Sequence, residues 1–163
     1  MSDEHRVLRE GLLVGLIAYA SVAVFYAVFD FLAARGPLFT VNLLGLAVFE
    51  GVRDPGILQR YIPVDLSVVF SYNALHLVFS LLIGLIVVWL VAEAERQPSR
   101  ARLVLVTIGG GFVVTILAVA QLTQAIRPLL PVWSIVLANA LAVVVAGRYL
   151  LRRHPGIWGR LVG

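Results

Sequence analysis

The sequence predicts an all-α integral membrane protein, a bundle of four transmembrane helices with one short re-entrant or interfacial helix between helices one and two. Two observations favour this class. Only 13% of the 163 residues are charged, about half the share that is usual in a soluble domain. The mean hydropathy is strongly positive, and four apolar runs are each long enough to cross a hydrocarbon core of about 30 Å. We therefore expect residues 1–163 to form a single membrane domain.

The first span is expected over residues 8–32. One face of this helix carries a ridge of small residues that ends at a tyrosine: Gly11, Gly15, Ala18, Val22 and Tyr26. Such a ridge allows the backbone of another helix to approach closely. Tyr19 and Asp30 border the ridge. Because Asp30 lies near the outer boundary of the span, we expect it to be a solvated helix end.

A short helix is expected over residues 40–50. Gly36 and Pro37 break the chain before it, Thr40 offers an N-cap, and Gly51 is the expected stop. Eleven residues that rise 1.5 Å each reach only about 16 Å. The segment is therefore too short to cross a bilayer, and we expect it to lie over the outer end of the bundle.

Three further spans are expected over residues 65–92, 103–126 and 130–151. A capping side chain at Asp65 starts the first of these. In the next span Gly111, Ala118 and Ala125 recur every seven residues, which predicts a close-packing seam. The triplet of residues 109–111 has the glycines of a phosphate-binding loop but lacks its lysine and the preceding strand. Packing is the better interpretation of these glycines.

Each of the four spans contributes a hydrogen-bonding side chain to the outer half of the bundle. The predicted polar layer consists of Tyr26, Asn73, His76, Ser80, Gln121 and Asn139. In the span 65–92, the side chains of Asn73, His76 and Ser80 share one quadrant of the helix with Gly84. Polar groups at this depth are costly unless they are paired, so they mark either a ligand site or bonding between helices.

His76 allows three interpretations. It can be a neutral imidazole that bonds to Asn139, Gln121 or Tyr26 across the bundle. It can be an axial ligand of a haem or chlorin, for which Ser80 and Gly84 would leave room. It can take part in a proton or quinone relay, although no span centre supplies an acidic partner. The cofactor, if any, is not specified by the sequence.

No catalytic residue and no metal-ligand set is predicted. The chain has no cysteine, which excludes disulfides and thiolate metal sites. His154 is expected on the opposite side of the membrane from His76, so the two cannot share a metal ion. Ser80 points alongside His76 on the same helix, without an orienting carboxylate, so a serine nucleophile is not indicated either.

The basic residues predict the orientation. All 13 are arginines, a usage that hints at a GC-rich bacterial source, and they gather at helix ends, where lipid headgroups and not nucleic acids are the expected partner. If the N and C termini are cytoplasmic, the inner side holds Arg6, Arg9, Arg96, Arg100, Arg102, Arg148, Arg152, Arg153 and Arg160. The outer side then holds only Arg35, Arg53, Arg60 and Arg127. This bias predicts cytoplasmic termini in a bacterial inner membrane.

These features favour a non-catalytic integral membrane protein that serves as an accessory or assembly subunit of a larger membrane complex. The expected partner is another membrane protein or a second copy of the chain. The alternative is a small membrane binder of a hydrophobic ligand or cofactor (haem, chlorin or quinone) that uses the polar layer around His76. A small transporter or channel is the third possibility.

Overall fold

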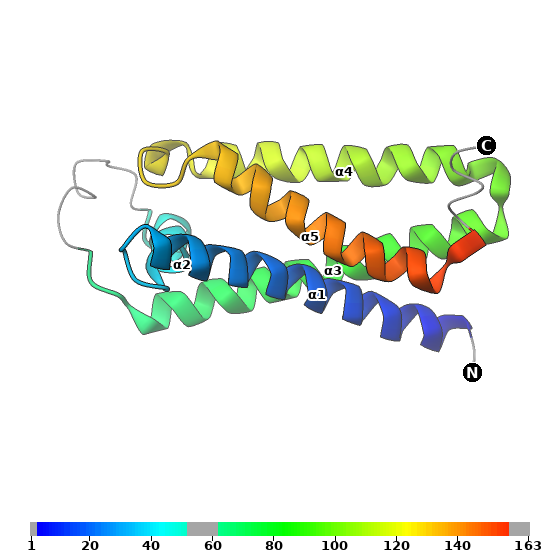
Figure 1. Ribbon diagram of the computed structural model, residues 1–163, viewed down its shortest axis with the longest axis horizontal. Helices are drawn as coiled ribbons and strands as arrows, with labels where there is room; N and C mark the ends of the chain where they lie inside the picture. Colours follow the sequence, from blue (N-terminus) through cyan, green and yellow to red (C-terminus); the bar gives the residue numbers. More distant parts are fainter. Residues whose placement is uncertain (1–2, 52–61, 157–163) are drawn as a thin grey trace.

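The computed structural model describes residues 3–51 and 62–156. Four long helices make up most of it: α1 (Asp3–Leu32), α3 (Leu66–Arg96), α4 (Ala101–Leu122) and α5 (Val132–Arg153). Figure 1 shows that α1 begins at the same end of the molecule at which α5 finishes and at which α3 is connected to α4. We call this the terminal end. The opposite end carries the short helix α2 (Phe39–Gly45) and is called the α2 end.

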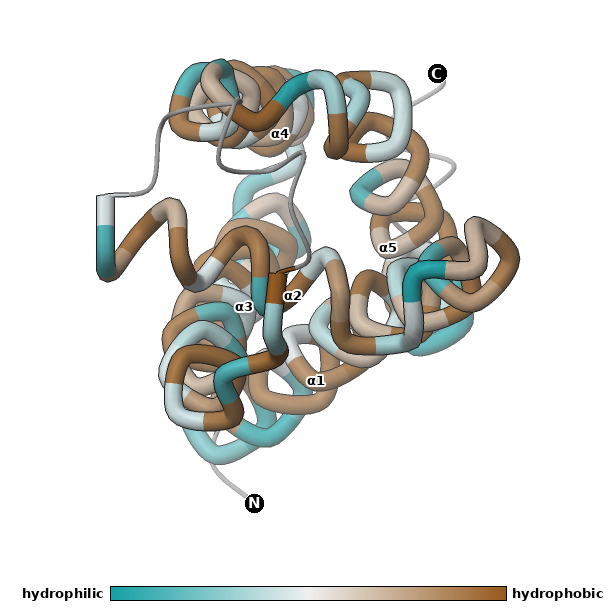
Figure 2. The backbone as a smooth tube through the Cα atoms, turned by 90° about the vertical axis from the view of Figure 1, so that its left-hand side faces the viewer, coloured by the Kyte–Doolittle hydropathy of each residue, from teal (hydrophilic) through white to brown (hydrophobic). Residues whose placement is uncertain are grey.

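The all-α fold class predicted from the sequence is confirmed. Within the two described stretches there is no strand, and the four long helices are apolar and long enough to cross a membrane. Large apolar side chains point outward, such as Phe70, which is 73% exposed, and Val106, which is 70% exposed. In Figure 2 hydrophobic colouring covers most of each helix. Because lipid tails solvate such side chains and water does not, the surface fits a lipid bilayer.

The contact between α1 and α3 is the most extensive in the described chain. The two backbones meet at glycines. A Cβ atom added to Gly84 would collide with the backbone of Gly11 and Gly15, and one added to Gly15 would lie 2.6 Å from the carbonyl oxygen of Ser80. Backbone atoms cannot swing aside as side chains do, so this close approach requires glycine. The small-residue ridge predicted on the first span therefore packs against α3.

Two apolar clusters hold the other elements to this helix pair. Towards the terminal end, α1, α3 and α5 share the buried residues Val14, Val88, Ala146 and Leu150. At the α2 end, the second cluster consists of Leu43, Leu44, Ile126, Leu130 and Ile135. This second cluster joins α2 to the start of α5 and to the 3-10 turn η4 (Gln124–Ile126). Each end of the molecule therefore has its own core.

The helix α4 is attached to the rest of the chain near its two ends. Its only buried residues are Ala101 and Val104, which pack on Ala94 of α3. Towards the α2 end, Ile116 and Val119 lie against the second cluster. Figures 1 and 2 both show α4 on the side of the molecule away from α1. The middle of α4 is therefore left largely without partners from the described chain.

Among residues 3–51 and 62–156, nothing packs against Gly111 of the predicted seam on the third span. Gly111 and Ala118 are exposed on α4, and a Cβ atom added to Gly109, Gly110 or Gly111 would have nothing within 4 Å. The span is also shorter than the predicted 103–126, because α4 ends at Leu122 and η4 follows it. Sequence periodicity shows which residues share a face, but it does not show what that face meets.

The short helix has the predicted length and stop. Residues 39–50 consist of α2 and a π-helical turn, η1 (Leu46–Glu50), which ends at Gly51 with a φ of 67°. That left-handed backbone favours glycine. Twelve residues rise about 18 Å, which is too little to cross a bilayer. The start differs from the prediction, since α2 begins at Phe39 and Thr40 is not its N-cap.

The start of α3 agrees with the predicted cap. The Asp65 carboxylate accepts hydrogen bonds from the backbone N–H groups of Ser67 (2.8 Å) and Val68 (3.2 Å). These two N–H groups have no partner within the helix, so the aspartate satisfies them. Asn42 of α2 fixes this corner, because its Oδ1 accepts from the Asp65 N–H (2.9 Å) and its Nδ2 donates to the Pro63 carbonyl (3.1 Å).

Candidate functional site

His76 lies on α3 where it faces α1, between two tyrosines. Its ring centroid is 5.2 Å from that of Tyr19 on α1 and 6.2 Å from that of Tyr72, one turn earlier on α3. The residue is half-buried. Within the described part of the chain, its ring nitrogens form no hydrogen bond. The imidazole is thus held by aromatic packing and not by the amides that the sequence suggested.

Asn73 provides the hydrogen bond between α1 and α3 at this level. The Tyr19 hydroxyl donates to Asn73 Oδ1 over 3.0 Å, and Asn73 Nδ2 donates to the carbonyl of Val69 on its own helix over 2.9 Å. Both ends of the carboxamide are therefore used. Tyr19 was not part of the predicted polar layer, although its place beside the small-residue ridge was a signal that it could face α3.

Ser80 and Gly84 lie at the closest approach of the two helices. Ser80 is buried, and its carbonyl faces Gly15 of α1. The space that Gly84 leaves is taken by the backbone of Gly11 and Gly15. The gap beside His76 that could have received a flat ring is therefore filled by α1.

The other three predicted residues make their contacts elsewhere. Tyr26 lies beside Ser134 of α5 and packs on the apolar cluster at the α2 end. Asn139 donates its Nδ2 hydrogen to the Ile135 carbonyl of its own helix, over 2.8 Å. Gln121 is exposed on α4. The structure therefore brings Asn73, Ser80 and His76 to one interface, and it does not join them to the polar groups of α4 and α5.

Asp30 differs from its prediction, because it is fully buried and not a solvated helix end. Its two carboxylate oxygens accept hydrogen bonds from the backbone N–H and from the hydroxyl of Thr40, each over 2.6 Å. The first of these satisfies an N–H group in the opening turn of α2 that has no partner within the helix. The chain doubles back after α1, and this places the carboxylate under α2. A position in the sequence near a span boundary could not reveal that turn.

Arg35 ties the same end of the molecule to the connection before α5. Its guanidinium donates to the Leu129 carbonyl over 2.8 Å. The group also lies over the rings of Phe29 and Phe39, at 5.3 Å and 5.0 Å from their centroids. Such stacking keeps a cation in a largely apolar setting. Asp30, Asn42 and Arg35 thus fasten the α2 end through side-chain to backbone contacts.

A second polar cluster, which the sequence did not reveal, lies at the terminal end. His154 follows the last residue of α5 and is only 4% exposed. Its Nδ1 lies 2.8 Å from Glu95 Oε1 of α3, and its Nε2 lies 3.0 Å from Glu10 Oε2 of α1. Arg6 of α1 approaches the other oxygen of Glu95 at 3.8 Å. We call Glu10, Glu95 and His154 the terminal clasp, because each comes from a different long helix or its end.

The clasp places one imidazole ring between two carboxyl groups, with Arg6 beside Glu95. Each ring nitrogen of His154 has one glutamate as its partner. The carboxylates lie on opposite sides of the ring, so they do not converge on a point where a metal ion could bind. Within residues 3–51 and 62–156, no group of three or more ligating side chains could hold a metal ion.

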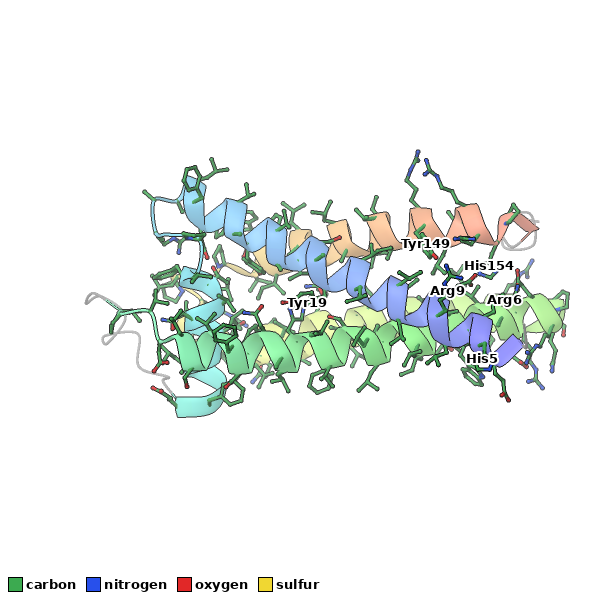
Figure 3. The ribbon with its side chains drawn as sticks, turned by 90° about the horizontal axis from the view of Figure 1, so that it is seen from below. His5, Arg6, Arg9, Tyr19, Tyr149 and His154 are labelled. Atoms are coloured by element: carbon green, nitrogen blue, oxygen red, sulfur yellow. The ribbon has the colours of Figure 1, made fainter. Side chains whose placement is uncertain are left out.

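Figure 3 shows the clasp region with its neighbours. Arg6, Arg9, Tyr149 and His154 lie together at the terminal end, whereas Tyr19 lies much nearer the middle of α1. The Tyr149 hydroxyl is buried without a hydrogen-bond partner in the described chain, and the Arg153 guanidinium lies 5.7 Å from the centre of the Tyr149 ring.

A sequence signal for the clasp existed, because Glu10 and Glu95 are acidic residues at helix ends that are otherwise rich in arginine.

The Tyr19–Asn73 pair and the terminal clasp each connect helices and use their hydrogen-bonding atoms to do so. No protein-family model matches the chain, and no curated protein and no solved structure is similar to it at a significant level.

Proposed function

We propose that this protein is a non-catalytic integral membrane protein that serves as an accessory or assembly subunit of a larger membrane complex. The observation that carries the proposal is the contrast between two sets of glycines. Gly11, Gly15 and Gly84 each lie against a neighbouring helix that fills the space of a side chain. The three glycines 109–111 in the middle of α4 are open, because a Cβ atom added to any of them would have nothing within 4 Å.

Glycine in a helix interior costs about 1 kcal/mol relative to alanine. Nothing in the described chain offsets this cost on α4, since its middle has few contacts with α1, α3 or α5. Small residues in transmembrane helices characteristically let another helix approach. A transmembrane helix of a partner protein that packs against Gly110 and Gly111 would supply the missing contact.

The polar side chains support a structural role over a chemical one. Asp30 bonds Thr40, Asn73 bonds Tyr19, and Asn139 bonds its own helix. Each contact fixes one element to another or satisfies an amide in an apolar setting. With the arginine bias, we further propose that the chain lies in a bacterial plasma membrane with the terminal end in the cytoplasm.

Photo-cross-linking from α4 tests the proposal. A benzophenone amino acid at Val106, an exposed position one turn before Gly110 on α4, should form adducts with a second polypeptide in native membranes. Gly110→Leu and Gly111→Leu should remove these adducts, because a leucine at either position occupies the space assigned to the partner helix. At the Cβ position neither substitution meets a residue that the structure describes, so the thermal midpoint of the purified protein should not fall.

The matched control is Ala20→Leu, which adds the same side chain at an exposed position on α1. It should keep the adducts. Adducts that contain only two copies of this chain would contradict the accessory role and would make α4 a surface for self-association. Adducts that persist equally in the glycine variants would show that the small-residue face is not the docking surface.

A ligand-binding function is the second candidate, and one observation favours it. The ring nitrogens of His76 have no hydrogen-bond partner in the described chain, and an intramembrane histidine with a free nitrogen can ligate haem or chlorin or bond a quinone. An absorption spectrum of the purified protein separates the two functions. A Soret, chlorin or quinone band that is lost in His76→Gln would establish the ligand, and a spectrum with protein bands alone would favour the packing role.

A further inference from the structure

An open depression, here called the hollow, lies on the outer side of α5 towards the terminal end. It measures about 440 Å³, and one face of α5 alone lines it: Val143, Val144, Gly147, Arg148, Leu151 and Arg152. Ala142 and Ala146, which are buried, lie on the opposite side of α5. The hollow therefore opens away from the helices that α5 packs against.

Gly147 supplies the space. A Cβ atom at this position would have nothing within 4 Å, so packing within the described chain does not require a glycine here. Glycine is among the least favourable residues in a helix interior. A notch with apolar walls on the lipid-facing side of a span has the shape to receive an alkyl chain.

Arg148 and Arg152 supply the charge. They are one turn apart, so their side chains lie on the same side of the helix, and both are exposed. Neither forms an ion pair with a residue that the structure describes. Two guanidinium groups next to each other, without a carboxylate between them, attract an anion that can accept several N–H donors.

Three acidic side chains at the terminal end contact other groups. Glu10 and Glu95 contact His154 in the clasp, and Glu93 pairs with Arg100 at 3.3 Å. The residues that line the hollow carry two positive charges and no negative charge.

We infer that this hollow, formed by Gly147 with Arg148 and Arg152, is a binding site for one anionic phospholipid. The phosphate lies between the two guanidinium groups, and an acyl chain lies in the notch over Gly147 against Val143 and Val144. The two arginines belong to the last turns of a span, the depth at which headgroups meet the hydrocarbon core. The apolar side chains of the hollow thus match the acyl chain of the lipid, and the two arginines match its phosphate.

The charge pair selects for the net charge of the headgroup. A zwitterionic lipid carries its own cation beside the phosphate, so the arginines gain less from it than from an anionic lipid. Free phosphate satisfies the arginines but leaves the apolar notch empty. The site should therefore prefer phosphatidylglycerol to phosphatidylcholine and to inorganic phosphate.

Native mass spectrometry of the full chain in detergent tests the inference. The protein is titrated with dioleoylphosphatidylglycerol or dioleoylphosphatidylcholine, and inorganic phosphate is added as a competitor in a third arm. Replacing both arginines in Arg148→Gln/Arg152→Gln should weaken the first phosphatidylglycerol binding step roughly 25-fold, at about fivefold for each charge. Gly147→Leu should weaken it about fivefold or more, because the leucine occupies the space of several methylene groups.

Two matched controls keep the result specific. Arg102→Gln removes an exposed arginine from the same end of the molecule, and Ala20→Leu adds a leucine at an exposed position on α1. Both should bind phosphatidylglycerol as the wild type does. Gly147→Ala, which adds one methyl group in open space, is a milder variant in case the leucine disturbs folding, and thermal midpoints are measured for every protein.

The outcomes separate the possibilities. Selective phosphatidylglycerol binding that the two hollow variants lose and the two controls keep supports the site. Equal losses in hollow and control variants would overturn it, because the lipid would then bind the whole surface without a defined place. Competition by inorganic phosphate as strong as that by the lipid, with binding unaffected by Gly147→Leu or Gly147→Ala, would also overturn it in favour of a simple anion site.

Discussion

At the scale of single residues, the terminal clasp joins three helices through one side chain. His154 is buried, while the side chain of Glu10 is 14% exposed and that of Glu95 is 28% exposed. Removal of the ring would take one contact from each of the two carboxylates, and the loss of partners at a buried site costs about 1 to 3 kcal/mol. The clasp therefore holds the ends of α1, α3 and α5 at a fixed spacing.

We predict that His154→Leu lowers the stability of the protein by about 1 to 3 kcal/mol in detergent, because it removes both contacts of the clasp. His154→Gln should cost less, since its amide keeps one donor. Thermal melts of the purified variants measure the order. The control His5→Gln changes an exposed histidine near the start of α1 and should leave the midpoint unchanged, and an equal loss from both histidines would contradict the clasp.

Asp30 and Thr40 form the corresponding link at the α2 end. Both residues are fully or almost fully buried, and two hydrogen bonds connect them. We predict that a double-mutant cycle of Asp30→Ala and Thr40→Ala gives a coupling energy of about 0.5 to 3 kcal/mol, which is usual for residues in direct contact. Thermal or denaturant unfolding measures the cycle. Additive effects of the two substitutions would mean that the hydrogen bonds contribute no net stability.

At the scale of helices, glycine has opposite roles on α3 and α4. Gly84 lies where α1 and α3 touch through their backbones, whereas Gly110 has open space around it. Replacement by alanine should therefore change the stability of the protein in opposite directions at the two positions. At Gly84 the added methyl group must push α1 and α3 apart. At Gly110 it only removes the conformational cost of a glycine inside a helix.

We predict that Gly84→Ala destabilises the protein by about 1 to 3 kcal/mol, the usual range for overpacking, and that Gly110→Ala is neutral or stabilises it by up to about 1 kcal/mol. Melting midpoints in detergent, without a partner protein, give both values. If Gly110→Ala destabilised the isolated chain as much as Gly84→Ala, the middle of α4 would be packed in solution, contrary to the open space around Gly110.

At the scale of the whole molecule, the ends of the long helices that carry most arginines lie together. The start of α1 and the end of α5 share the terminal end with the turn η3 (Pro98–Arg100). An even number of crossings and the arginine bias predict that this end is cytoplasmic. The short helix of residues 39–50 then faces the outside.

Single cysteines test this orientation, because the chain has none of its own. Ser99 at the terminal end and Glu50 at the α2 end are both exposed. An impermeant maleimide added to intact cells should label Glu50→Cys at once and Ser99→Cys only after the membrane is opened. The reverse pattern would invert the orientation, and labelling of both on intact cells would contradict four crossings.

The sequence by itself determined the membrane class, the four spans and the short helix. These follow from local properties: apolar runs of sufficient length, glycine and proline breaks, and a cap such as Asp65. It also determined that Gly11 and Gly15 form a ridge, because the helical repeat fixes which residues share a helix face. What each face meets depends on how the helices are placed, and the helical repeat carries no information about that.

The tertiary structure alone decided which distant residues meet. His154 reaches Glu10 across a sequence separation of 144 residues, Asp30 turns inward to Thr40, and the seam at Gly111 faces outward instead of into the bundle. Each outcome rests on the relative position of whole helices, which is set by the sum of many weak packing contacts. Among the predicted polar residues, Asn73, Ser80 and His76 share an interface since they lie on one helix, while Gln121 and Asn139 lie on helices whose placement no local pattern fixes.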